Sequence, residues 1–482
     1  MFATHDRRTT RHGLIAALVV GVSLGGACRD APVSPRPRVG TSVPVLAMAA
    51  TTDDVELLRA LVARLEADAA LNKGQANALT SKIEAAARRL QTGKEPAEGN
   101  IFDAFVHQVN AFVNARVLTV TQAQPLLDAV LSLTGNGVAR RPLAAGYRFT
   151  CALTITGEAR CWGWNEYGQL GDGTTETRLV PVPVKGGVSF RQIAGGASHA
   201  CALTGEGVVY CWGAGGAGQL GDGTTTDRWV PAPVATALRF TQLTTGVSHT
   251  CGLTRTGSAY CWGWNIAGGL GDGGWADRSL PTPVVGDLSF TEIRAGGWHT
   301  CAIAAGAGLY CWGWNNFGQL GDGSTATRNV PIPIGGGVEF KQIAAYAYHT
   351  CALTSAGEAY CWGIIENRLI PTLVPGGVTF ATLSGGGVRG THTCAVSTDG
   401  PTFCWGVNNY GQIGDGTNIT RPVPTRIAGT YAFVELSGGG EHTCGRTAAA
   451  QIYCWGGNFV GQLGDGTTTS RNSPTPIAAT GW

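Results

Sequence analysis

Short stretches that alternate apolar and polar residues fill the chain from residue 143 to its end. In one representative unit, residues 190–193 alternate in this way, and residues 201–203 and 208–212 form two further apolar runs separated by glycines. Residues 180–184 have the same extended character but contain two prolines. A period of two predicts half-buried strands, and a strand that contains proline belongs at the edge of a sheet. The pattern therefore predicts four short strands per unit.

This unit recurs seven times. Its first cysteine falls at positions 151, 201, 251, 301, 351, 394 and 444, and a second cysteine follows ten residues later in every copy. A 50-residue period held over several units indicates a repeat architecture. One four-stranded unit cannot bury both of its faces, and radial stacking leaves only short edges exposed. The predicted fold is an all-β seven-bladed β-propeller over residues 143–482, with a small N-terminal all-α module.

The two ends of the repeat region suggest how the ring closes. The first copy starts at Leu143, the equivalent of Ile193, and lacks the phenylalanine that precedes this position elsewhere. The last copy ends with residues 477–482, close to where that phenylalanine is expected. We therefore expect the C-terminus to complete the blade that the N-terminus begins.

Three motifs carry a family resemblance: residues 249–253 (His-Thr-Cys-Gly-Leu), the pair Trp312-Gly313, and residues 315–321 (Asn-Asn-Phe-Gly-Gln-Leu-Gly). Together they resemble the repeat of the regulator of chromosome condensation family. The resemblance covers residues 143–482 and implies a seven-bladed propeller. It says little about function, because one fold hosts unrelated activities.

Residues 51–135 have a helical period instead. Leu58, Leu61, Val62 and Leu65 share one face, and a stripe of phenylalanine and valine follows within residues 102–113. Thr121 and Gln124 have the spacing of a capping box, which predicts a further helix start. Residues 71–76, 104–109 and 118–119 resemble the helical module called FIMAH, found on exported bacterial proteins. That resemblance implies an accessory role, and His107 within the stripe is interpreted as structural.

The N-terminus resembles an export signal. Three arginines precede an apolar run over residues 14–24, and the small residues 25–27 lead into Cys28. Residues 24–28 resemble a bacterial lipobox, which predicts a signal peptide over residues 1–27 and lipidation of Cys28, with simple secretion as the alternative. Residues 28–50 form a proline-rich tether and residues 136–142 a linker. Without residues 1–27 the chain is near neutral, so its charge gives no reason to expect nucleic acid as a partner.

The fourteen repeat cysteines predict structural disulfides within each hairpin, because residues ten apart face each other when the turn lies midway between them. Such a set indicates an oxidising compartment. Zinc-site and redox interpretations are less consistent with seven identical pairs. The expected pairs are Cys151–Cys161, Cys201–Cys211, Cys251–Cys261, Cys301–Cys311, Cys351–Cys361, Cys394–Cys404 and Cys444–Cys454.

Two polar residue types recur at fixed positions. A histidine occupies one position in six copies, and Phe149 takes it in the first copy; a Gly-Asp-Gly turn with an arginine six residues later also recurs in six copies. We interpret both sets as structural, the alternatives being a metal or proton site for histidine and calcium for aspartate. No hydrolase elbow or metalloprotease motif is present in the sequence, so we expect no catalytic residues, metal or cofactor. The histidines are His199, His249, His299, His349, His392 and His442, and the aspartates are Asp172, Asp222, Asp272, Asp322, Asp415 and Asp465.

Positions at which the copies disagree are the candidates for binding. The residue before each histidine varies between small, charged and aromatic types. On loops at one rim these residues would form a varied surface, with aromatic and arginine residues of the kind enriched at binding hot spots. Neutral drift of loop residues is the alternative. The fifth copy also differs, because it is ten residues shorter between Trp362 and Pro371 and three residues longer near residues 388–390. The predicted partner-binding residues are Tyr147, Arg148, Trp298, Tyr346, Tyr348, Arg389 and Glu441.

These features favour a monomeric, exported, lipid-anchored scaffold that binds a protein or surface glycan through loops, without catalysis. The secreted β-lactamase inhibitory propellers resemble it in fold and compartment, so inhibition of an extracellular enzyme is one form of this hypothesis. The alternative implied by the family is guanine-nucleotide exchange on a small GTPase with chromatin binding. A unique polar cluster in the central channel would be the signal for an enzyme.

Overall fold

The computed structural model describes residues 52–91, parts of residues 105–126, and residues 141–479 apart from 155, 365–367, 385–389 and 448. The predicted signal peptide, tether and linker lie outside the described residues, as do Cys28, His107 and Arg389. Among the helices that are described, none is long and apolar enough to cross a membrane.

The N-terminal module contains two described helices, α1 (Thr52–Ala67) and α2 (Lys73–Gln91). Leu58 and Val62 of the expected apolar face are buried against Leu79 and Ile83 of α2. α2 begins with a reciprocal cap, in which the Asn72 and Gln75 side chains each accept the other's backbone N–H at 2.9 Å.

A second reciprocal cap lies two residues before the expected capping box. Thr119 N–H donates to Gln122 Oε1 at 2.9 Å, and Gln122 N–H donates to Thr119 Oγ1 at 3.3 Å. The expected partners Thr121 and Gln124 lie outside the described residues. The Thr-x-x-Gln spacing occurs at both places, so spacing alone did not distinguish between them.

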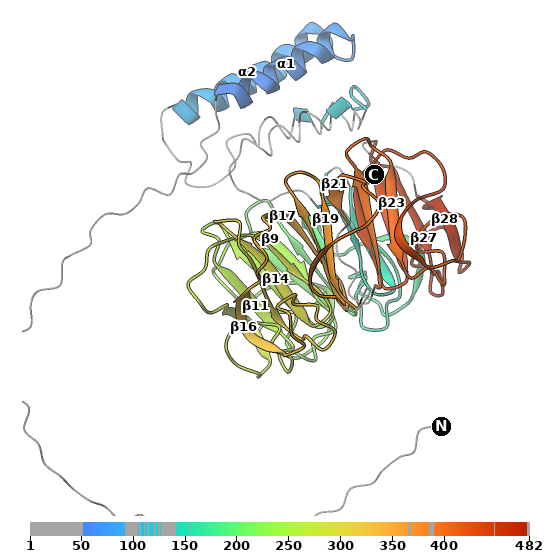
Figure 1. Ribbon diagram of the computed structural model, residues 1–482. Coiled ribbons are helices and arrows are strands. Elements are labelled where there is room, and N and C mark those ends of the chain that lie inside the picture. The colour runs from blue at the N-terminus through green and yellow to red at the C-terminus, as the bar shows by residue number, and fades with distance from the viewer. Residues whose placement is uncertain are drawn as a thin grey trace, which may run out of the picture. The chain divides into compact units, whose positions relative to one another are not determined.

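The repeat region folds into seven four-stranded antiparallel sheets, each made of consecutive strands (Figure 1). This confirms the seven-bladed propeller. The innermost strands are β1 (Leu143–Ala145), β5 (Gln192–Gly195), β9 (Phe240–Thr245), β13 (Phe290–Ala295), β17 (Phe340–Ala345), β21 (Phe380–Leu383) and β25 (Phe433–Gly438). The second strands are β2 (Phe149–Leu153), β6 (His199–Leu203), β10 (His249–Thr254), β14 (His299–Ala304), β18 (His349–Thr354), β22 (His392–Ser397) and β26 (His442–Thr447).

The third strands are β3 (Ala159–Gly163), β7 (Val209–Gly213), β11 (Ala259–Gly263), β15 (Leu309–Gly313), β19 (Ala359–Gly363), β23 (Thr402–Gly406) and β27 (Ile452–Gly456). The outermost strands are β4 (Arg178–Pro183), β8 (Arg228–Pro233), β12 (Arg278–Pro283), β16 (Arg328–Pro333), β20 (Arg368–Leu373), β24 (Arg421–Arg426) and β28 (Arg471–Pro476). As expected, the proline-containing strand lies at the outer edge of its sheet, where a missing N–H leaves no ladder bond unmade.

Each interface between neighbouring blades, called a seam here, has its own apolar core. At the seam between the second and third blades, Leu203 and Leu220 of one blade pack with Phe240 and Trp262 of the next. The tryptophan of every third strand is at most 2% exposed. Burial of side chains this large supplies much of the hydrophobic stabilisation of the ring.

Seven disulfides cross the hairpins of the second and third strands, as predicted. The two cysteines of each pair face each other in register, with Cα–Cα separations of 4.0 to 4.1 Å. All fourteen cysteines are buried. The strand register of each hairpin therefore places its two cysteines directly opposite each other.

The ring closes differently from the prediction. All four strands of the first blade come from residues 143–183, so the described C-terminal residues add no strand to it. Instead the last blade meets the first through hydrogen bonds and apolar packing: Ser437 accepts the Ala145 N–H at 2.9 Å, Gly440 N–H donates to Tyr147 O at 3.2 Å, and Ile477 packs with Leu143 and Trp162. The expectation overlooked that the three residues of β1 already pair with β2. Residues 480–482 lie outside the described residues.

Candidate functional site

The loops that follow the inner strands meet at one end of the central channel, and we call this end the loop end. A chain of backbone hydrogen bonds joins neighbouring loops there. Ala197 N–H donates to Val247 O at 3.2 Å, and Val247 N–H donates to Gly297 O at 3.0 Å. Gly297 N–H in turn donates to Tyr346 O at 2.9 Å. The loops that follow the third strands lie at the same end, because each third strand runs antiparallel to the second.

Four half-buried aromatic side chains form a cluster at the loop end, which we call the aromatic cluster: Trp298, Trp314, Phe317 and Tyr348. Trp298 contacts Trp314 edge to face with ring centroids 5.1 Å apart, and it lies 5.8 Å from Tyr348. Phe317 lies 5.5 Å from Tyr348. The structure therefore brings together the predicted residues Trp298 and Tyr348. The sequence analysis missed Trp314 and Phe317, although the residues in the loops after the third strands also differ between copies.

Arg148, Tyr147 and Glu441 form a second group at the seam between the first and last blades. The Arg148 guanidinium carbon lies 5.0 Å from the centroid of the Tyr147 ring and 5.5 Å from that of Phe459. Its Nε lies 3.4 Å from a carboxylate oxygen of Glu441. All three predicted residues are therefore together, but their charges already compensate each other. Phe459, which is 43% exposed, is the member that faces solvent most.

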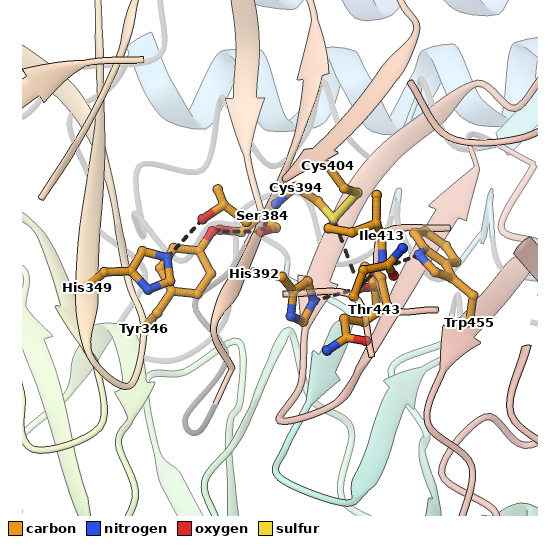
Figure 2. The surroundings of a disulfide bond; sticks show 12 residues. Tyr346, His349, Ser384, His392, Cys394, Cys404, Ile413, Thr443 and Trp455 are labelled. Atoms are coloured by element: carbon orange, nitrogen blue, oxygen red, sulfur yellow. Dashed lines mark hydrogen bonds between the residues drawn. A yellow bond between two sulfur atoms is a disulfide. The ribbon is translucent and has the colours of Figure 1, made fainter. Parts of the chain in front are cut away.

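Tyr346 does not belong to this surface. It is completely buried, its ring stacks on His349 with centroids 4.3 Å apart, and its hydroxyl lies 2.9 Å from Ser384 Oγ (Figure 2). Glycines occupy the equivalent positions in neighbouring blades, where a histidine ring packs directly over Gly196, Gly246 and Gly296. Tyr346 was placed on the binding surface because it is aromatic and near Tyr348, but the preceding strand directs it inward.

The six histidines are buried and each bridges a seam. In every case Nε2 lies 2.8 to 3.1 Å from the threonine Oγ1 that follows the equivalent histidine position in the next blade. At most of these seams the threonine donates its own proton to a loop carbonyl, as Thr250 does to Gln219 O at 3.0 Å. The threonine oxygen therefore accepts a hydrogen bond from Nε2–H, which fixes the histidine tautomer.

Burial holds these histidines in the neutral form. Desolvation lowers the pKa of His199, His299, His349 and His442 to about 3 and that of His249 and His392 to about 4. For five of the six, no hydrogen-bond partner of Nδ1 lies among the described residues, so a second proton would find no acceptor. The histidines are therefore seam residues, in line with their structural interpretation. No group of three or more described His, Cys, Asp or Glu side chains is arranged to hold a metal ion.

The exception at Phe149 is matched across the seam. The residue that would accept the bond from a histidine at 149 is Ala200, whereas the equivalent position is threonine in every other copy. Phe149 and Ala200 are both completely buried in the same apolar cluster. The two substitutions therefore compensate each other, a relation that the sequence analysis did not notice because it compared each position separately.

The Gly-Asp-Gly loops are held by the predicted aspartate–arginine pairs. In the third blade Arg278 Nε donates to Asp272 Oδ2 at 2.7 Å, and Asp272 Oδ1 accepts from Gly274 N–H and from Asn265 Nδ2 at 2.9 Å. Burial alone would raise the pKa of Asp272, but these hydrogen bonds and the Arg278 charge lower it. Both carboxylate oxygens are therefore engaged within the loop, and the same pairing recurs at the other five aspartates.

The short loop of the fifth copy leaves a seam that differs from the others. At four of the other seams one loop carbonyl accepts from both the threonine and the tryptophan of the next blade: for example, Gln319 O accepts from Thr350 Oγ1 at 2.8 Å and from Trp362 Nε1 at 2.9 Å. The equivalent donors at the shortened loop are Thr393 and Trp405. Thr393 keeps its bond with His349 at 2.9 Å, but no described loop residue provides such a carbonyl.

The family assignment follows from comparison with known proteins. Residues 118–371 match the model of the RCC1-like domain, and residues 399–445 and 450–481 match that of the regulator of chromosome condensation (RCC1) repeat. The chain belongs to the RCC1-like family. The aromatic cluster lies on loops that differ even between copies of this chain.

Three solved structures of this fold illustrate the likeness. Human WBSCR16 is 24% identical over 62% of this chain and 83% of its own, with a TM-score of 0.57. Yeast RCC1 (Prp20) in complex with Kap60 is 19% identical over 71% of this chain and 85% of its own, with a TM-score of 0.60. Prp20p from Saccharomyces cerevisiae is 19% identical over 72% and 88%, with a TM-score of 0.61. These RCC1-like structures share the fold with this chain.

Proposed function

We propose that the chain is an exported, lipid-anchored, non-catalytic scaffold that binds a protein or a surface glycan through its loop end. The aromatic cluster carries this proposal. Aromatic side chains provide large contact areas at little conformational cost and are enriched at binding sites. Four of them lie in mutual contact on variable loops, and each is partly open to solvent.

The seven disulfides support the exported location, because such bonds persist in oxidising compartments. The same bonds argue against the alternative of a GTPase exchange factor with chromatin binding, whose partners lie in reducing compartments. Prp20p has been characterised for binding to Gsp1p and histones, but the likeness of 19% identity reflects the fold.

Binding is tested with purified chain on glycan arrays and by crosslinking to proteins of the cell envelope. Wild type is compared with Trp298→Ala/Tyr348→Ala and with the control Leu373→Ala, which removes a 49% exposed side chain at the end of β20. We expect one ligand class to be retained by the control and lost by the double variant. Equal binding by all three chains would contradict the use of the aromatic cluster.

The location is tested separately. Labelled palmitate should enter the wild-type chain and should not enter a Cys28→Ala variant, and the exported chain should contain no free thiols among its repeat cysteines. Free repeat thiols together with absence of label would contradict export and favour the exchange-factor alternative.

A further inference from the structure

The central channel contains a cavity of about 420 Å³ that is lined by the inner strands of the blades. Its lining includes Ala144, Ala194, Thr244, Ser384 and Ser437, which belong to one layer of residues that is small in six of the seven blades, Ala344 being the sixth. The seventh member of this layer is Arg294. A volume of this size lies within the usual range for small-molecule sites.

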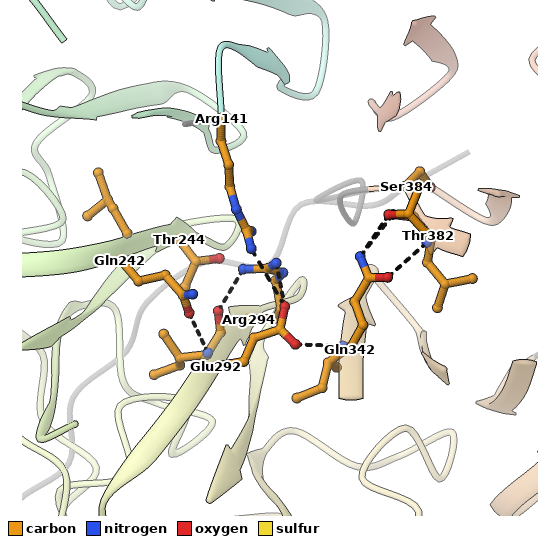
Figure 3. A network of polar contacts seen from close by, with 12 residues as sticks. Arg141, Gln242, Thr244, Glu292, Arg294, Gln342, Thr382 and Ser384 are labelled. Atoms are coloured by element: carbon orange, nitrogen blue, oxygen red, sulfur yellow. Dashed lines mark hydrogen bonds and ion pairs between the residues drawn. The ribbon is translucent and has the colours of Figure 1, made fainter. Parts of the chain in front are cut away.

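Arg294 therefore places a charged side chain at a position where the other six blades carry a small residue (Figure 3). It is 6% exposed, it pairs with Glu292, and its Nη1 donates to Ile293 O at 3.2 Å. Arg141 Nη2 lies 3.7 Å from the same carboxylate of Glu292. Two guanidinium groups thus share one carboxylate, and burial together with the charge of Arg141 lowers the pKa of Arg294 to about 9.

A third arginine enters the cavity from the seam that closes the ring. Arg446 lines the cavity and is only 7% exposed, and among the described residues its guanidinium has no hydrogen bond or ion pair. Leucine, isoleucine or valine holds this position in the other six copies. In those blades the aliphatic side chain packs against the phenylalanine of the next blade, as Leu203 packs with Phe240, and the first blade lacks that phenylalanine.

The remaining polar groups of the cavity include hydrogen-bond donors. Thr244 Oγ1 accepts the Ala295 N–H at 3.0 Å, and Ser437 Oγ accepts the Ala145 N–H at 2.9 Å. Each hydroxyl therefore keeps its own proton for a further acceptor. Three arginines face two carboxylates here, Glu292 and Glu435, which leaves one net positive charge. A buried site with excess donors and one net positive charge is matched by a single carboxylate, which a guanidinium binds in a bidentate geometry.

We propose that this cavity is a binding site for a small monocarboxylate, held by Arg446 and Arg294. The entrance is the end opposite to the loop end, where a more open hollow of about 440 Å³ shares Arg141, Gln342 and Thr382 with the cavity and adds the exposed Lys341. At the loop end, backbone hydrogen bonds join neighbouring loops. This site is independent of the aromatic cluster, so either can fail without the other.

The copies of the repeat provide the variants for a test. Arg446→Leu introduces the residue found at positions 203, 253 and 353, and Glu292→Gln/Arg294→Ala reproduces the Gln-Ile-Ala found at residues 192–194 and 342–344. Both substitutions therefore occur naturally in folded blades of this chain. Arg255→Leu, on an exposed hairpin turn, removes the same charge far from the channel and serves as the control.

Binding is measured by saturation-transfer difference NMR with propionate at constant ionic strength, using the full chain and inorganic phosphate as competitor. We expect saturable binding by wild type and by Arg255→Leu, and at least tenfold weaker binding by the two cavity variants, with the unfolding temperature of each recorded. If one cavity variant fails to fold, the other decides the question. Undiminished binding by a folded cavity variant, or no saturable binding by wild type, would overturn the proposal. Phosphate that binds more tightly than propionate would overturn the assignment to a monocarboxylate.

Discussion

The compensated pair Phe149 and Ala200 predicts that a seam with a histidine–threonine hydrogen bond can be converted into one with a phenylalanine–alanine apolar contact. We choose His249 and Thr300, whose Nε2 and Oγ1 lie 3.1 Å apart. The three variants are His249→Phe, Thr300→Ala and the double substitution, which makes this seam resemble the one between the first and second blades. Phe149 packs over Gly146 as His249 packs over Gly246, so the ring has an equivalent place.

The expected energies follow from the partners that remain. Thr300→Ala leaves a buried imidazole N–H without its acceptor, which costs about 1 to 3 kcal/mol. The carbonyl of Gly269 keeps the Trp312 Nε1 bond at 3.0 Å and so stays satisfied. His249→Phe removes the seam bond but leaves Thr300 donating to Gly269 O at 2.8 Å, so we expect a loss of about 1 kcal/mol. In the double variant no buried group is left unpaired, and its cost should fall about 1 to 2 kcal/mol short of the sum.

Denaturant unfolding of the four chains gives the coupling free energy directly. His249→Phe/Thr350→Ala is the matched control, because Thr350 accepts from His299 and not from His249. The two changes of the control should add within about 0.5 kcal/mol. If the seam pair also proved additive, or if the double variant were less stable than the sum, the histidine–threonine bond would not be the reason for the paired substitution.

Three further predictions concern stability. Burial lowers the histidine pKa values from the ordinary value of 6.5 to about 3 or 4, so the stabilisation is complete above about pH 6.5 and is lost as the pH falls. Each imidazole should cost about 1 kcal/mol at pH 5.5, so an unfolding temperature equal at pH 7.5 and 5.5 would contradict their burial. Cys301→Ala/Cys311→Ala should reduce the free energy of unfolding by up to about 3 kcal/mol through loop entropy, measured against wild type under oxidising conditions, and a change near zero would show that the hairpin persists in the unfolded chain. Asp322→Asn keeps the oxygen that accepts hydrogen bonds in the loop but removes the charge that faces Arg328. The free energy of unfolding should therefore fall by roughly 1 kcal/mol, and by less in 1 M salt. A fall that did not depend on salt would contradict the ion pair.

Most of the fold could be predicted because the chain repeats. The four strands per blade, the edge position of the proline strand and the cysteine register all follow from local periodicity, which seven copies make unmistakable. Ring closure could not be derived in the same way. It depends on contacts such as that between Ala145 and Ser437, which are 292 positions apart in the sequence, and the missing phenylalanine of the first copy suggested a strand exchange that β1 does not need.

The candidate site was predictable only in part. Variation between copies pointed to Trp298 and Tyr348, and the structure places both half-buried on loops at the loop end. It misplaced Tyr346, because an alternation of one residue decides whether a side chain at a strand end faces solvent or the neighbouring blade. The cavity arginines were missed for another reason: Arg294 and Arg446 lie on strands of different blades, and only the closed ring brings them to the same channel.

The bond from each histidine to the threonine of the following blade bears on how such a chain could be recombined. The spacing of the cysteines defines one copy of the repeat. The histidine and the threonine that bond to each other, however, belong to two successive copies. Exchanging the copy that contains Phe149, or the copy that contains Ala200, for another copy would therefore introduce a mismatch at the border between these two blades. Because the histidine and threonine positions of one copy are adjacent, every cut within the repeats separates at least one such residue from its partner in the next blade. Chimaeras and consensus designs should therefore be cut only where the copies on both sides of the border carry histidine and threonine at these positions.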